Sequence, residues 1–595
     1  MIKRLVYQNN TDNQAIEYVY RTLIKKYILL LAAMGMMSGC YDLDQFPHDR
    51  LSSGTFWKTE DHAHQGMVAM YNTLLNENVF GAYYNNDALG EIAMDYNNWQ
   101  MPSIIKGTYT DRGGLVESKW QSAYNGVFRA NLLLQNIDGV DISEDEKDVY
   151  KGEARFMRAL YYFHLFDFYG GVPLYDETTV VGEEFMTMNK PRATEEETVK
   201  FILDDLNAAV SVLPVKWEST EYGRATRGAA VALRGKVKLY TKDYVGAQAD
   251  FEDIVFDKEG YGYGYGLIDN YPDLFTLAGD QSKEIIFSIQ CINGTNNNYG
   301  LPYCLRLGTR AAFGGCWNNC MPTDILADMY EYKDGRPFSW DEIYPGFSAD
   351  RAMQKRIFEA TLSEDGKTVA AYPADKDKIR SIYESRDPRM EQTLITPYCH
   401  FLGCNGRTPK EMEYVLATGV NEANGFLRDN LGHNNYYWRK FVPEGDMDGI
   451  LEDRSYSPVD FPLIRYADVL LMLAECYNEN GEQGKAVELI NQVRQRKSTN
   501  MPKLNSGPAW LKAETKAEVF ERIVHERAVE LACEGHRFGD LKRWGLAKEK
   551  LNYEYDDILG KFIFKRVFVD RDYHFPIPAV EFERNSQLGK QNPGW

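Results

Sequence analysis

The chain has 595 residues, 44% of them hydrophobic, and its formal net charge is −20 at pH 7. A chain of this length and apolar content can bury a large core, whereas so negative a charge opposes binding to polyanions and anionic lipid surfaces. Because no basic patch with interleaved aromatic residues offsets this charge, we exclude nucleic acid as a partner.

The N-terminus has the form of a bacterial secretion signal. A basic stretch, residues 21–26, precedes a mostly apolar run, residues 27–37, which is too short to cross a bilayer as a stable helix. Small residues at positions 38 and 39 then precede Cys40, an arrangement that resembles the bacterial lipobox. We therefore predict a lipoprotein signal peptide over residues 1–39 and lipid attachment at Cys40, where several acyl chains give stable anchoring.

Helical patterns begin soon after this anchor. Thr59 is a candidate N-cap for a first helix, and apolar faces predict further helices over residues 120–137 and 150–169. Thr194 and Glu197 have the spacing of a capping box, which predicts a helix that ends before the proline at position 214.

Two segments, residues 77–113 and residues 293–323, lack this periodicity and are rich in aromatic and amide side chains. Long irregular segments within a compact domain are commonly binding loops. Flat aromatic rings suit the apolar faces of a sugar, and Asn, Asp and Arg suit its hydroxyl groups. We therefore predict that these loops bind carbohydrate. The candidate contact residues are Tyr83, Asp95, Tyr96, Asn97, Asn98, Trp99, Tyr303, Arg310, Trp317 and Asn318.

The middle of the chain gives weaker patterns. Alternating Tyr and Gly over residues 260–266 predict an irregular connector. Residues 284–290 are predicted to form a strand, because β-branched and aromatic side chains predominate there. Residues 331–460 mix Pro, Gly and charged residues without a clear period, so no path is predicted for them.

Nine cysteines are an ordinary number for this length. Apart from Cys40, the pair Cys316 and Cys320 and the pair Cys399 and Cys404 have spacings that suit local disulfides or half of a zinc site each. No pair of histidines with suitable spacing accompanies them. Simple burial or a local disulfide is therefore favoured, and no metal or other cofactor is expected.

The clearest periodic pattern lies between residues 464 and 544. Residues 465–477 predict a helix, Gly481 ends it, and residues 486–493 predict a second helix. Their apolar and small residues fall at the offsets of a tetratricopeptide hairpin, and a degenerate copy covers residues 233–254. One hairpin cannot bury its apolar face alone. We therefore predict a mainly α fold: a scaffold of tetratricopeptide-like helical hairpins with long irregular loops and a few short strands.

A third helix in this block carries Glu526, Glu530 and Glu534, which share one face. Like charges at four-residue spacing repel one another unless cations neutralise them. We predict that they form scaffold ion pairs with cations such as Arg537 or Arg543.

Short blocks of residues along the chain occur in the order found in one known family. They are Gly152-Glu153-Ala154-Arg155-Phe156-Met157-Arg158-Ala159-Leu160-Tyr161-Tyr162, Gly170-Gly171-Val172-Pro173-Leu174, Arg465-Tyr466-Ala467-Asp468, Glu526-Arg527, Glu534-Gly535-His536-Arg537, Asp540, Arg543-Trp544, Pro576-Ile577-Pro578 and Gln591-Asn592-Pro593-Gly594-Trp595. Together they resemble the SusD/RagB-like outer-membrane nutrient-binding lipoproteins.

The resemblance implies one SusD-like domain over residues 40–595. Its N-terminal part, residues 40–330, would carry the ligand loops, and residues 331–595 would hold an irregular region and the C-terminal hairpins. The resemblance also implies a surface-exposed position in the outer membrane, because Asp42 and Asp44 resemble the acidic export tag of surface lipoproteins. The implied partner is a SusC-like TonB-dependent transporter that receives the captured oligosaccharide.

Two alternatives stay open. Some members of this family bind oligopeptides, and the loops do not distinguish a peptide from a sugar. A helical glycoside hydrolase would need two carboxyl groups roughly 5 to 10 Å apart across an aromatic cleft. The sequence contains no nucleophile elbow, phosphate loop or metalloprotease pattern. Carboxylate pairs such as Asp204-Asp205 and Asp556-Asp557 are expected at the surface, so we predict no enzymatic activity.

Overall fold

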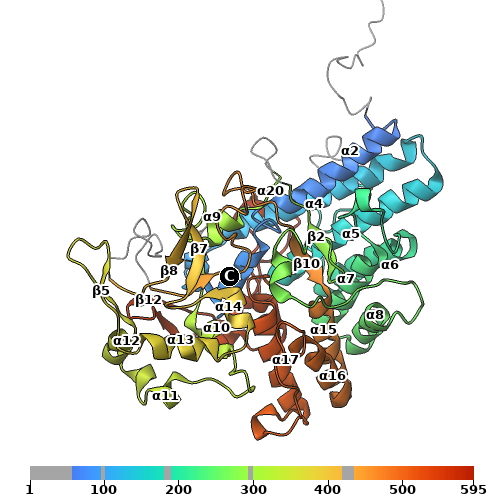
Figure 1. Cartoon of the computed structure of the whole chain (residues 1–595). Coiled ribbons are helices and arrows are strands. Elements are labelled where there is room, and N and C mark those ends of the chain that lie inside the picture. Colours follow the sequence, from blue (N-terminus) through green and yellow to red (C-terminus); the bar gives the residue numbers. More distant parts are fainter. Residues whose placement is uncertain (1–55, 96–100, 180–188, 293–298, 419–433) are drawn as a thin grey trace, which may run out of the picture. The chain divides into compact units, whose positions relative to one another are not determined.

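The structure is a computed structural model that describes residues 56–95, 101–179, 189–292, 299–418 and 434–595 (Figure 1). The chain divides into a short N-terminal unit, residues 1–59, and a large unit, residues 60–595. The predicted signal peptide and lipid attachment at Cys40 lie outside the described residues. The same holds for four predicted contact residues, which are Tyr96, Asn97, Asn98 and Trp99.

The first half of the large unit is a series of long helices, each packed against the next in the chain (Figure 1). Two of them begin with capping boxes, one at Ser143 and one at Thr194, and the second was predicted. The bounds are α2 (Glu60–Tyr71), α4 (Gly114–Asn136), α5 (Glu144–Tyr169), α6 (Glu195–Val212), α7 (Arg227–Tyr240) and α8 (Tyr244–Phe256). The predicted helices are present, although α4 and α5 each begin nearly two turns earlier than their apolar patterns indicated.

The C-terminal hairpin extends this series. Helix α15 (Tyr466–Glu479) packs against α8, against α16 (Gln483–Arg494) and against α17 (Lys516–Glu530). The turn after α15 passes through Gly481, whose φ is +86°. The predicted hairpin and its degenerate copy, α7 with α8, are therefore neighbours in space, and each covers the apolar face of the other. The mainly α fold predicted from the sequence is confirmed.

Short antiparallel strand pairs connect the helices. Within the described residues each sheet has two strands, which pair as β1 with β3, β2 with β10, β4 with β5, β6 with β9, β7 with β8, and β11 with β12. The bounds are β1 (Ala93–Asp95), β2 (Ile285–Ile289), β3 (Cys320–Pro322), β4 (Thr361–Leu362), β5 (Val369–Ala371), β6 (Leu394–Ile395), β7 (His400–Asn405), β8 (Thr408–Glu413), β9 (Tyr437–Trp438), β10 (Phe461–Arg465), β11 (Glu554–Asp556) and β12 (Phe562–Lys565). The predicted strand is β2.

The described parts of residues 331–460, for which the sequence predicted no path, contain short helices and hairpins on the opposite side of the large unit from α8 (Figure 1). The remaining short helices of the large unit are α3 (Met101–Ile105), α9 (Tyr303–Leu307), α10 (Asp324–Met329), α11 (Trp340–Ile343), α12 (Arg351–Phe358), α13 (Lys376–Glu384), α14 (Arg389–Thr393), α18 (Arg537–Arg543), α19 (Ala547–Lys550) and α20 (Ala579–Arg584). Most of these helices span fewer than two turns, which is too short for a repeated apolar pattern to be recognised in the sequence.

A buried ion-pair network joins α17 to the rest of the large unit. Glu526, Glu530 and Glu534 are fully buried, and each contacts at least one cation. The carboxylate Oε1 of Glu530 lies 2.9 Å from Nη1 of Arg465 and 2.8 Å from Nη1 of Arg496. The cations of the network are Arg389, Lys440, Arg465, Arg494 and Arg496. Buried carboxylates are tolerated only when paired in this way.

The predicted ion pairing is therefore present, but the predicted partners were wrong. Arg537 binds Glu91, with Nη2 and Oε1 2.6 Å apart. Arg543 binds Asp540 at 2.8 Å and also contacts Glu475. Both arginines lie beyond the end of α17 at Glu530. Glu534 also lies beyond that end, so the prediction that one helix face carries all three glutamates was wrong for Glu534.

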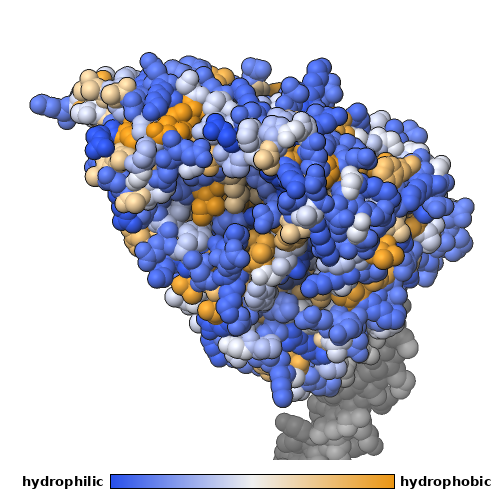
Figure 2. Space-filling model, turned by 90° about the horizontal axis from the view of Figure 1, so that it is seen from below, coloured by the Kyte–Doolittle hydropathy of each residue, from blue (hydrophilic) through white to orange (hydrophobic). Residues whose placement is uncertain are grey.

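Apolar side chains are mostly turned inward. On the face shown in Figure 2, hydrophilic residues predominate and apolar residues form separated patches. Across the described ranges, every helix is too short or too polar to serve as a membrane span.

Candidate ligand-binding site

The pairing of β1 with β3 brings the two predicted binding loops together. Asp95, in the first loop just before the undescribed residues 96–100, lies opposite Cys320, near the end of the second loop. The hydroxyl of Thr323 donates to the carbonyl of Glu91 at 2.6 Å and continues this contact. Residues more than two hundred positions apart thus meet at one place, as a shared site requires.

Trp317 is the predicted aromatic contact with the clearest exposure. Its side chain is 38% exposed, although its neighbours in the chain are buried. Its backbone N–H donates to the carbonyl of Leu305 at 2.8 Å, and the N–H of Asn319 donates to the carbonyl of Arg306 at 2.7 Å. Backbone hydrogen bonds on both sides therefore hold the segment that presents the ring.

Arg306 lies beside this ring, with its guanidinium carbon 5.2 Å from the ring centroid. The same guanidinium pairs with Glu77, with Nη2 and Oε2 3.0 Å apart. A cation over an indole face stabilises the orientation of both side chains. Arg306 and Glu77 were not among the predicted site residues, because an ion pair between positions so far apart leaves no local pattern in the sequence.

Three predicted contact residues have almost no exposed side-chain surface, which corrects the expectation that their side chains reach ligand at the loop surface. Tyr303 is fully buried and donates to the carbonyl of Val459 at 2.9 Å. Asp95 is buried and accepts a hydrogen bond from the side chain of Asn85 at 3.1 Å. Asn318 is also buried. Tyr303 and Asp95 therefore support the loops from within.

Asn318 has an unusual environment. Its backbone is left-handed, with a φ of +49°, and neither polar atom of its side-chain amide has a hydrogen-bond partner. Leaving a buried amide unsatisfied costs roughly 1 to 3 kcal/mol. Groups of this kind in folded proteins are usually satisfied by ordered water or ligand atoms.

Tyr83 turns away from the second loop. Its ring packs against His536 at a centroid distance of 6.0 Å, and it lines a small internal cavity with Asp167 and Lys236. Burial raises the pKa of its phenol well above the usual range. The neighbouring Tyr84, which was not predicted, packs on Tyr303 at 5.8 Å instead. The one-residue difference arises because a 3-10 helix, Tyr83–Leu89, sets which ring faces which side.

Arg310 is half-buried in the loop between α9 and Trp317. The carbonyl oxygens of this loop are held by Arg454, whose Nη1 donates to Gly314 at 2.7 Å and also to Gly315. Trp317 and Arg310 thus lie on one braced loop, and of the predicted contacts within the described residues they are the two best placed to meet a ligand.

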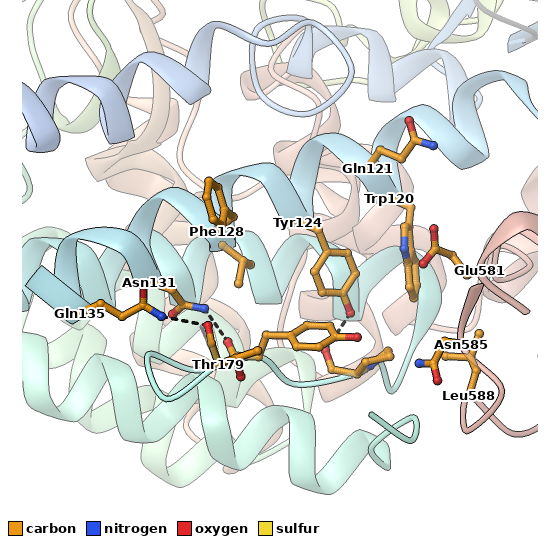
Figure 3. Close-up of a pocket in the computed structure, with 13 residues that line it drawn as sticks. Trp120, Gln121, Tyr124, Phe128, Asn131, Gln135, Thr179, Glu581, Asn585 and Leu588 are labelled. Carbon is orange, nitrogen blue, oxygen red and sulfur yellow. Dashed lines mark hydrogen bonds between the residues drawn. The ribbon is translucent and has the colours of Figure 1, made fainter. Parts of the chain in front are cut away.

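A hollow separate from the two loops lies along α4 (Figure 3). Its volume is about 310 Å³. Trp120, Tyr124 and Phe128 occur every fourth residue of α4 and form one wall, and Tyr175 faces Tyr124 at a centroid distance of 5.8 Å. Glu581, from α20, closes one end of the hollow.

Most polar side chains of this hollow already have partners, although the buried hydroxyl of Thr179 has none. Tyr124 donates to the carbonyl of Pro173 at 2.8 Å, Asn131 donates to that of Tyr175 at 2.9 Å, and Gln135 donates to that of Thr179 at 2.9 Å. These bonds fix residues 173–179 against α4. The hollow therefore offers few groups to the hydroxyls of a sugar, and we do not place the site there.

One carboxylate of each pair named from the sequence is buried against structural partners. Asp205 is buried and binds Arg158 at 2.7 Å, and Asp557 is buried and accepts the N–H groups of Leu559 and Lys561. The expectation that both pairs lie wholly at the surface was therefore wrong for these two residues. Each has a structural partner, and among the described residues no group of His, Cys, Asp and Glu forms a metal site.

The eight described cysteines are free thiols. Neither Cys316 with Cys320 nor Cys399 with Cys404 is bonded. Cys320 lies in β3, and Cys399 precedes β7 while Cys404 is near its end, so strand geometry separates the members of each pair.

Comparisons with known proteins agree with this architecture. A model described as the SusD family matches residues 283–595, and one described as starch-binding associating with outer membrane matches residues 43–239. A SusD-like protein of Formosa agariphila is 23% identical, covering 93% of this chain and 96% of its own. The starch-binding protein SusD of Bacteroides thetaiotaomicron is 22% identical, covering 97% and 99%.

Solved structures have the same fold. A SusD-like carbohydrate-binding protein from Bacteroides fragilis superposes with a TM-score of 0.73 at 27% identity, covering 90% of this chain and 100% of its own. Surface glycan-binding protein A from Bacteroides thetaiotaomicron, solved in complex with laminarihexaose, superposes with a TM-score of 0.61 at 17% identity, covering 90% and 100%.

Proposed function

The chain belongs to the SusD family, and from that premise we propose that it is a surface glycan-binding lipoprotein. It captures an oligosaccharide at the two joined loops and passes it to a SusC-like TonB-dependent transporter. The lipid on Cys40 holds it on the outer leaflet of the outer membrane. The protein binds its ligand without breaking bonds.

The observation that carries this proposal is the exposed, braced ring of Trp317 at the junction of the two loops. An exposed indole offers a flat apolar face to the C–H surface of a sugar, and Arg310 on the same segment offers donors to its hydroxyl groups. The likeness to a structure solved with laminarihexaose supports a glycan as the ligand class. The proposed contact set comprises Trp317 and Arg310 together with Tyr96, Asn97, Asn98 and Trp99.

Isothermal titration of the purified chain against a panel of oligosaccharides tests the proposal. We expect Trp317→Ala and Trp99→Ala each to weaken binding about tenfold or more, because truncating a central aromatic anchor commonly costs more than about 1 kcal/mol. Trp510→Ala is the matched control, since Trp510 is 39% exposed but lies on a different segment. Unchanged affinity in both loop variants would show that the glycan does not bind at these two loops.

Further measurements on the same protein distinguish the alternative functions. An oligopeptide panel, titrated in parallel, identifies a peptide-binding member of the family if only peptides bind. Prolonged incubation with each bound oligosaccharide, followed by chromatography, identifies a hydrolase if shorter sugars appear. Co-purification with a TonB-dependent transporter from native membranes tests the partner, and mass spectrometry of the mature N-terminus tests the lipid on Cys40.

A further inference from the structure

Two thiols meet at the base of the loop that presents Trp317. The Sγ atom of Cys304, on α9, lies 3.3 Å from the Sγ atom of Cys316. Both side chains are fully buried. Among the described cysteines this is the one pair of thiols in hydrogen-bond contact.

The backbone brings these two residues together. Gly308 lies between them, and a Cβ atom there would be 2.4 Å from the carbonyl oxygen of Cys304 and 3.1 Å from the Cβ atom of Cys316. Only glycine at this position therefore leaves room for the two cysteines to approach. Leu305 follows Cys304 in the chain, and Trp317 follows Cys316. The N–H of Trp317 donates to the carbonyl of Leu305 at 2.8 Å, so a backbone hydrogen bond holds the two ends of the loop together beside the cysteines.

We propose that Cys304 and Cys316 form a disulfide in the exported protein, which closes the loop that carries Arg310 and fixes the base of Trp317. The proposal rests on the export to an oxidising compartment that the proposed function includes. The sulfurs must approach by about 1.2 Å to reach a disulfide bond length. The spacing in the sequence had suggested Cys316 with Cys320, but the fold gives Cys316 a different partner.

The oxidant of the two cysteines is the disulfide of a thiol oxidoreductase in the export pathway. The thiolate of one cysteine attacks a sulfur of that disulfide and displaces the other sulfur as a thiolate. The second cysteine then attacks the mixed disulfide, so the Cys304–Cys316 bond forms and the oxidoreductase leaves as a dithiol. It takes up the two electrons and the two protons that the cysteines lose.

This exchange takes place while the loop is still open. In the folded chain the hydrogen bond to Cys316 and burial raise the pKa of Cys304 well above its usual range, so little thiolate is present. Once the loop has packed, burial shields the bond from reductants as well.

The test uses the full chain secreted into an oxidising periplasm. The protein is denatured, alkylated without reductant, digested with trypsin and mapped by mass spectrometry. We expect one cross-linked peptide pair containing Cys304 and Cys316, with the other described cysteines alkylated. Cys304→Ser should free Cys316 for alkylation. Cys476→Ser, the matched buried control on α15, should leave the cross-link intact.

The same wild-type sample is also refolded with oxidised and reduced glutathione, which tests the pairing whatever compartment the chain occupies. Alkylation of both cysteines in the secreted and the refolded protein would overturn the proposal, and so would a cross-link between other cysteines. Glycan titration of the same sample keeps the two claims apart. Binding without the cross-link refutes the disulfide alone, and a cross-link without binding supports the disulfide and counts against glycan capture.

Discussion

The guanidinium of Arg306 lies against the ring of Trp317, 5.2 Å from the ring centroid, and is held there by Glu77 from the other loop. The exposed aromatic surface is therefore not an isolated side chain. Its orientation depends on an ion pair that crosses the junction of the two loops, and this dependence can be tested.

Glu77→Gln should weaken glycan binding by a few-fold while leaving thermal stability nearly unchanged. The substitution removes the anion that positions Arg306, whereas a partly exposed ion pair contributes only about 0 to 1 kcal/mol to folding. Titration calorimetry measures the first effect and thermal unfolding the second. Glu342→Gln is the control, because Glu342 pairs with Arg336 at an exposed position away from the loops. Equal affinities for wild type and Glu77→Gln would show that Arg306 does not orient the ring.

Arg465→Ala should destabilise the fold by about 3 to 5 kcal/mol, because it leaves buried carboxylates without their cation. Arg465 contacts Glu284 at 3.0 Å, Glu530 at 2.9 Å and Glu534 at 2.6 Å. Urea unfolding of the purified chain measures the loss. The exposed Arg112 provides the control, and Arg112→Ala should change stability by no more than about 0.5 kcal/mol. A similar small change for Arg465→Ala would contradict the assigned role of the network.

Gly535→Ala should cost several kcal/mol. Gly535 has a φ of +82°, and a Cβ atom there would lie 2.1 Å from the carbonyl oxygen of Tyr83, which the backbone cannot move aside cheaply. Gly481 is a matched control, since its φ is +86° and a Cβ atom there meets nothing within 4 Å. Gly481→Ala should therefore cost only the left-handed penalty of about 1 to 2 kcal/mol. Denaturant unfolding compares the two, and equal losses would exclude the contact with Tyr83 as the cause.

Asp87→Asn should change how stability depends on pH. Burial raises the pKa of Asp87 to about 7, although it accepts the N–H groups of Gly535 and Arg537. A carboxyl whose folded pKa exceeds its unfolded pKa of about 3.9 binds more protons when folded. It therefore destabilises the fold as pH rises from about 4 to 7, by up to about 4 kcal/mol.

The measurement is the melting temperature of wild type and Asp87→Asn from pH 4 to pH 8. The difference, variant minus wild type, should grow more positive with rising pH, because the variant has no charge to bury. Taking the difference removes the opposite effect of Glu534 and Asp540, whose lowered pKa values make the fold lose stability as pH falls in both proteins. A difference that stays constant over this range would mean that Asp87 does not titrate there.

The sequence predicted the long helices well, because a period of three to four residues and capping residues such as Thr194 act locally. It also predicted the hairpin and its copy, and the order of its short blocks was sufficient to indicate the family. The two candidate binding loops were predicted from composition, because long segments without a period that are rich in aromatic and amide residues are commonly binding loops.

The sequence did not predict which residues of those loops reach the surface. The burial of Tyr303 and Asn318, the turn of Tyr83 toward His536, and the cations that meet Glu526, Glu530 and Glu534 all depend on residues far away in the chain. The pairing of Cys304 with Cys316 instead of Cys320 has the same origin. Local patterns determined where helices form and which family the chain belongs to. Long-range packing alone decided which side chains face one another, because burial and charge pairing depend on three-dimensional neighbours that no local spacing specifies.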